Sequence, residues 1–84
     1  MEDKKKKLEI MDSVLTKMED IENTQQSLMQ KLGQVEVELY DVKSPDLDES
    51  LGRVMTRASE TLDIVKEARE DFEMKKNAIA NDSV

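Results

Sequence analysis

The chain has 84 residues and a formal net charge of −7, with 39% of its residues charged and 37% hydrophobic. Its length suits one small domain that buries little surface by itself, so association with other chains is a common source of stability. The negative charge argues against nucleic-acid binding and against an anionic membrane as a partner, because such proteins carry a basic face. The short basic run Lys4 to Lys7 is interpreted as a solvated tail.

The residue types exclude most chemistry. The chain has no cysteine and no histidine, so disulfides, thiolate metal sites and redox chemistry are excluded. Its carboxylates are expected on exposed helix faces, where pKa values are not shifted for acid–base catalysis. The segment from Asp46 to Gly52 lacks the glycine and glutamate spacing of a calcium loop and is interpreted as helix capping. We therefore predict no catalytic residue, no cofactor, no metal site and no enzymatic activity.

The distribution of apolar residues also bears on location. We find neither the apolar run of a signal peptide nor the roughly 20 apolar residues that a membrane-spanning helix needs. The sequence therefore predicts a soluble, cytoplasmic protein without a membrane partner.

Taken in chain order, the sequence predicts an all-α protein, since two glycines and one proline are too few for a β-protein. Residues 1–7 form a charged, flexible lead-in, and residues 8–43 form a first helix. Ser44 and Pro45 break the chain, because proline disfavours a helical conformation in the residue before it. Residues 46–80 form a second helix, and Ser44 is its predicted N-cap. Asp46 and Asp48 lie near its N-terminus, where their negative charge interacts favourably with the helix dipole. Residues 81–84 form a polar tail.

The first helix carries an apolar seam that repeats every seven residues, as the pairing of helices in a left-handed coiled coil requires. Nine of its ten positions are apolar, and Gln25 is the exception. Gln25 is interpreted either as a lock on the register or as a tolerated polar residue. The predicted oligomer interface consists of an a row with Met11, Met18, Gln25, Leu32 and Leu39, and a d row with Val14, Ile21, Leu28, Val35 and Val42.

Charged residues beside the seam favour a parallel arrangement of identical first helices. In a parallel, in-register pair, each of three attractive pairs joins residues five positions apart on neighbouring chains. The predicted interface flanks are Lys17 with Glu22, Lys31 with Glu36, and Glu38 with Lys43. Leucine or methionine at a and mostly valine or isoleucine at d shifts the preference to higher oligomers. We predict a tetramer, followed in preference by a trimer.

The second helix carries a weaker apolar stripe whose phase differs from that of the first. Either it folds back on the first helix as a helical hairpin, or it diverges and offers its stripe to a partner. The short connection favours the hairpin. Its predicted packing face comprises Leu47, Leu51, Val54, Met55, Ala58, Leu62, Val65, Phe72 and Ile79.

These features predict a non-enzymatic oligomerisation or scaffold protein. It would self-associate through the heptad seam and present helix two or the termini to protein partners. The alternative is a small acidic chaperone or anti-regulator that docks its helices onto a partner protein.

Overall fold

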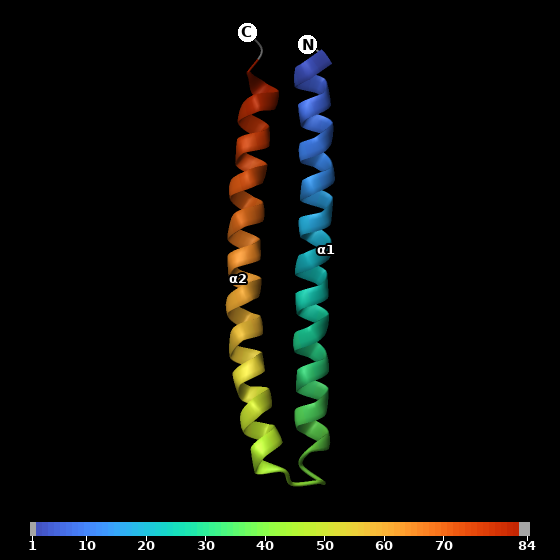
Figure 1. Cartoon of the computed structure of the whole chain (residues 1–84), viewed down its shortest axis with the longest axis vertical. Helices are drawn as coiled ribbons and strands as arrows, with labels where there is room; N and C mark the ends of the chain where they lie inside the picture. The colour runs from blue at the N-terminus through green and yellow to red at the C-terminus, as the bar shows by residue number, and fades with distance from the viewer. Residues whose placement is uncertain (1, 83–84) are drawn as a thin grey trace.

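The computed structural model describes residues 2–82 and consists of two long helices, α1 (Glu2–Glu38) and α2 (Pro45–Asn81). They run antiparallel, with the N- and C-termini at one end and residues 39–44 closing the other (Figure 1). The molecule measures 64 × 15 × 13 Å. The predicted all-helical class is confirmed, and this elongated shape fits the predicted helical hairpin. Met1, Ser83 and Val84 lie outside the described residues, so the predicted tail is described only to Asp82.

The first helix begins six residues before the predicted start, so the lysine run belongs to α1 rather than to a lead-in. Glu2 and Asp3 occupy the first turn, where carboxylates interact favourably with the positive end of the helix dipole. The Lys4 Nζ also donates a hydrogen bond to the Asp82 backbone carbonyl beyond the end of α2. Both interactions support helical structure where the charge run predicted none.

The first helix also ends five residues earlier than expected, at Glu38. The Tyr40 N–H donates to the Val37 carbonyl at 3.2 Å, which tightens the chain into a turn before it reverses towards Pro45. The last predicted heptad therefore lies outside the helix. Val42 is 69% exposed and, like Lys43, belongs to the connection.

The second helix begins at Pro45, one residue before the predicted start. Ser44 is its N-cap with an extended backbone (φ −141°, ψ 89°), and its carbonyl accepts the first helical hydrogen bond from the Asp48 N–H at 2.9 Å. The Ser44 side chain makes no capping hydrogen bond. The start of α2 is therefore stabilised by Pro45 and by Asp46 and Asp48 in the first turn.

The two helices meet along seams with a shared seven-residue repeat. On each helix, an a row and an e row, which lies four residues later, alternate along the contact. The a row of α2 begins at Leu51 and its e row at Met55. Buried seam residues are Met11, Leu15, Glu22 and Leu32 on α1, with Ala58 and Leu62 on α2. The half-buried ones are Leu8, Met18, Gln25, Met29, Glu36, Leu51, Met55, Val65, Arg69, Phe72, Lys76 and Ile79.

A charged pair occupies the middle of this seam. The buried Glu22 carboxylate accepts a hydrogen bond from Arg69 Nε, while Arg69 Nη1 also reaches the Glu73 carboxylate at 3.2 Å. The hydrogen bond to Glu22 raises the pKa of Arg69 above its usual value. The stabilisation that Arg69 gains is therefore present below the ordinary pKa of arginine while Glu22 keeps its charge, and it is lost as the pH rises through the raised value.

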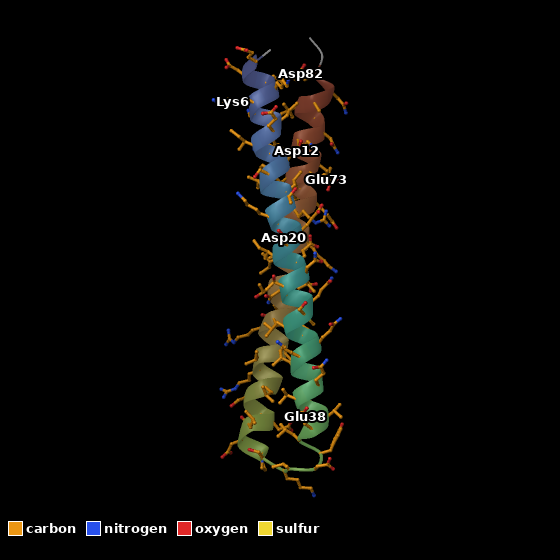
Figure 2. The ribbon with its side chains drawn as sticks, turned by 90° about the vertical axis from the view of Figure 1, so that its right-hand side faces the viewer. Lys6, Asp12, Asp20, Glu38, Glu73 and Asp82 are labelled. Atoms are coloured by element: carbon orange, nitrogen blue, oxygen red, sulfur yellow. The ribbon has the colours of Figure 1, made fainter. Side chains whose placement is uncertain are left out.

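A second ion pair, between Lys76 and Asp12, sets the register nearer the open end. Together with the Glu22–Arg69 pair it places Met11 level with Lys76, and Met18 level with Arg69. Gln25 Nε2 donates a long hydrogen bond of 3.4 Å to the Ala58 carbonyl. Gln25 therefore lies in the contact between α1 and α2 of the same chain. Other charged side chains, such as Lys6, Asp20 and Glu38, point into solvent (Figure 2).

Replacing Arg69 tests the contribution of the charged pair. We expect Arg69→Leu to lower Tm by roughly 5–10 °C, because the buried Glu22 carboxylate loses its partner. The double variant Glu22→Leu/Arg69→Leu should recover most of the loss, since two leucines suit positions flanked by Leu15 and Leu62. Circular dichroism melts at one protein concentration measure both effects. Glu73→Gln is the control and should change Tm little; an unchanged Tm in Arg69→Leu would contradict the pairing.

The two helix-interior glycines allow a second test. A Cβ atom built on Gly33 or Gly52 meets nothing within 4 Å. We expect Gly33→Ala and Gly52→Ala each to raise the free energy of unfolding by about 0.5–1 kcal/mol, because alanine favours the helix without a clash. Urea denaturation measures the change. A loss of stability would mean that another surface packs closely against these glycines.

Candidate interaction surface

The covered seam uses only half of the predicted oligomer interface. Within α1 the a row faces α2, whereas Val14, Ile21 and Leu28 of the d row are exposed and Val35 is half-buried. Ile21 is 49% exposed and Leu28 is 39% exposed. The hairpin therefore leaves a regular row of β-branched and leucine side chains next to its seam and in contact with solvent.

The second helix has a matching d row, which contains Leu47, Val54, Thr61 and Ala68. Leu47 is 44% exposed, Val54 is 42% exposed, and the other two are also exposed. Residues at d lie roughly 80° around the helix from the middle of an a/e seam. Because the helices are antiparallel and pack through equivalent rows, both d rows point to the same side of the hairpin. The side that contains the two d rows is called the open face.

Side chains at the edges of the open face come from the g rows, which lie one residue before each a position. Ile10, Lys17, Thr24 and Lys31 form this row on α1, and Arg57, Ile64 and Asp71 continue it on α2; all are exposed. Within the helices, the d and g rows carry five basic residues against three acidic ones, although the whole chain has a net charge of −7. These are Lys7, Lys17, Lys31, Arg57 and Lys75, with Asp3, Glu38 and Asp71. The open face is thus largely apolar and weakly basic as a whole, whereas its g-row edges carry equal numbers of basic and acidic residues.

The predicted flanks are divided between the two sides of the hairpin. Lys17, Lys31 and Glu38 are exposed, whereas Glu22 and Glu36 lie in the e row of the covered seam. Glu22 is already paired with Arg69 of its own chain. The predicted pair between Glu22 and Lys17 of another copy would therefore compete with an ion pair that Glu22 already forms within its own chain.

The predicted packing face of helix two is divided in the same way. Its members from the a and e rows line the covered seam, whereas Leu47 and Val54 lie on the open face. Arg69 was not predicted as a seam residue, and no signal within α2 identifies its partner 47 residues away. Leu15 was likewise not among the predicted interface residues, yet it is buried in the seam. The regular spacing of Leu8, Leu15 and Met29 was the signal that a second apolar row exists.

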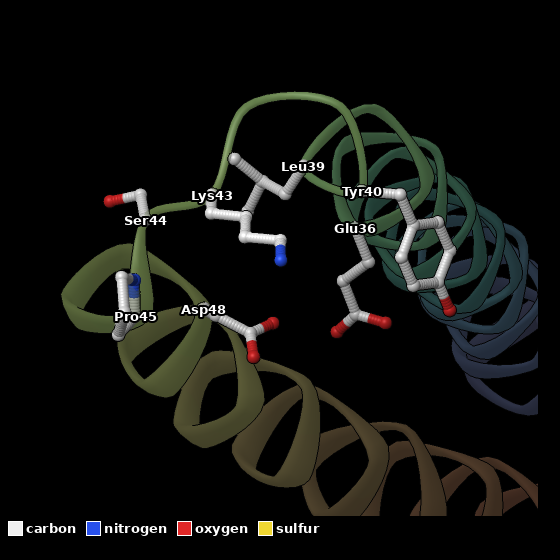
Figure 3. A pocket seen from close by; sticks show the side chains of 7 residues that line it. All are labelled: Glu36, Leu39, Tyr40, Lys43, Ser44, Pro45 and Asp48. Carbon is white, nitrogen blue, oxygen red and sulfur yellow. The ribbon is translucent and has the colours of Figure 1, made fainter.

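The closed end of the hairpin contains a shallow hollow between the connection and the first turns of α2. The Lys43 ammonium group points into the space between the Glu36 and Asp48 carboxylates, with Leu39 and Tyr40 on the α1 side (Figure 3). Groups of three or more potential metal-ligating side chains do not occur among the described residues. The hollow therefore brings one ammonium group and two carboxylates together within a small area. The open face is more extensive, so it is the stronger candidate for an interaction surface.

Two further findings complete the description of the surface. Within residues 2–82, neither helix provides an apolar stretch long enough to traverse a bilayer. The chain matches no protein-family model, no curated protein and no solved structure.

Proposed function

We propose that this chain is a non-enzymatic self-association module whose hairpins join through the open face and present their outer helix surfaces and ends to other proteins. One observation carries the proposal. The d rows of both helices, in phase with the covered seam, form a largely apolar strip along the side of the hairpin. Isolated surface leucines or valines are ordinary, but apolar residues repeated in register are typical of a second helix-packing interface.

The exposed area supports this interpretation. The hairpin has 6754 Å² of accessible surface, whereas a compact monomer of 9.7 kDa has about 5,100 Å². The excess, roughly 1,600 Å², exceeds the approximately 800 Å² that each partner buries in a stable protein–protein interface. Within residues 2–82, no side chain is fully buried. A hairpin with so thin a core gains stability from any partner that covers its open face.

Leu28→Asp tests this proposal directly. We expect the wild-type chain to show a multiple of 9.7 kDa by light scattering. The Leu28→Asp variant should shift to the monomer mass, because association would bury an unpaired carboxylate in an apolar interface. Met74→Asp is the matched control, since Met74 is exposed at 69% outside the d and g rows and its replacement should leave the mass unchanged.

A third variant separates association from folding. Leu32 belongs to the covered seam and is buried against α2. Leu32→Asp should cost several kcal/mol of folding free energy and reduce helicity, whereas Leu28→Asp should retain helicity at high protein concentration. A wild-type chain that is helical and monomeric at all concentrations would overturn self-association. It would instead favour a module that docks its open face onto a different protein.

A further inference from the structure

We propose that the open face binds a second copy of this chain with both connections at the same end, giving a two-fold symmetric bundle of four helices. The inference rests on the proposed function and specifies its geometry. A two-fold axis parallel to the helices places α1 of each copy against α2 of the other. Neighbouring helices are then antiparallel throughout, as in bundles with up-and-down topology.

The sizes of the d-row side chains favour this arrangement. The d row of α1 is bulky, whereas that of α2 has two small members, Thr61 and Ala68. A rotation about an axis parallel to the helices leaves heights unchanged, so the register within one chain also applies between chains. That register is fixed by the Glu22–Arg69 and Asp12–Lys76 pairs. Among the d-row residues of the second copy, it sets Ile21 nearest Ala68, Leu28 nearest Thr61, and Val35 nearest Val54.

The competing two-fold arrangement has its axis perpendicular to the helices and places the connections at opposite ends. It brings α1 against α1 and α2 against α2. Bulky side chains such as Ile21 and Leu28 then meet their own row, while Thr61 and Ala68 meet the α2 row, whose side chains are smaller on average. One side of the bundle would be overpacked and the other underpacked, and both conditions destabilise a core. The same-end arrangement reduces this imbalance by pairing a large with a small residue at the Ile21–Ala68 and Leu28–Thr61 layers.

Polar residues match in the same register. Thr61 of the second copy also comes level with Gln25, the single polar member of the a row, whose amide already donates to the Ala58 carbonyl. Polar side chains from both copies therefore meet in one layer instead of facing apolar neighbours. At the edge of the face, Lys17 lies level with Asp71 of the second copy, which gives two attractive pairs per dimer.

One pair of edge residues opposes this assembly and provides a sensitive test. Lys31 lies level with Arg57 of the second copy, so two like-charge pairs occur in each dimer. Arg57→Glu should convert them to attractive pairs and tighten the dimer roughly threefold to tenfold, as measured by sedimentation equilibrium. Arg53→Glu is the matched control, because Arg53 is exposed outside the d and g rows and changes the net charge equally. In the opposite-end arrangement Arg57 faces the α2 row that contains Asp71, and the same change would weaken the dimer or leave it unaffected.

The orientation can be measured with a spin label, because the chain contains no native cysteine. Asp41→Cys places one nitroxide in the exposed connection of each full-length chain. Adjacent helices are 8–10 Å apart, so connections at the same end should give a label-to-label distance of roughly 20–30 Å by pulsed electron resonance. Connections at opposite ends would give a distance approaching the 64 Å length of the hairpin. Asn77→Cys, near the other end, should repeat the short distance and show that the label has not perturbed the connection.

The outcomes separate the arrangement from the function on which it rests. A dimer mass with short distances at both sites supports the arrangement. A dimer mass with long distances overturns it and leaves self-association intact. A monomer mass with no dipolar coupling overturns both proposals.

Discussion

The structure depends on a mismatch between the number of apolar rows on each helix and the number that a hairpin covers. A pair of helices in contact buries two rows, here a and e, and on both helices a third row at d lies immediately beside them. Helices with only two apolar rows would complete their packing within one chain. The third row points to one side because the two helices are antiparallel and use equivalent positions. Sequence periodicity, hairpin topology and the position of the open face therefore have a common origin.

The parts of the fold that could be predicted from the sequence are those that depend on local signals. The heptad repeat and the break at Ser44-Pro45 identified two helices, because both signals are local. The choice between Val14 and Leu15 as the residue that faces α2 was not local. Both follow Met11 at spacings suited to an apolar seam, so α2 decides which row it covers. Glu22 weakened the apparent e row, and only the distant Arg69 explains how a carboxylate is accommodated there.

The ends of the helices illustrate a second limit of local reasoning. The residues after Glu38 have a helical pattern, yet the chain must reverse before Pro45, and the turn at Tyr40 and Asp41 ends α1 early. At the other terminus, the lysine run repels itself but gains a contact across the hairpin through Lys4 and Asp82. In each case, tertiary closure of the hairpin outweighs the preference of a short segment. The d row of α1 was assigned to an oligomer interface, which stays a prediction, and it was not combined with the d row of α2.

Charge and symmetry explain how an exposed apolar strip is compatible with a finite assembly. Two identical faces that meet through a two-fold axis cover each other completely, whereas a face that bound a different patch would leave one copy free to add another. The outer surfaces of the hairpin carry most of the acidic residues and repel one another, while the open face, with five basic and three acidic residues, does not share that excess. In the proposed dimer, long-range repulsion would disfavour contacts between outer surfaces, and the apolar rows would favour contact through the side that lacks an excess of negative charge. In the proposed assembly, the acidic composition would limit where copies meet, and the heptad rows would determine how they pack.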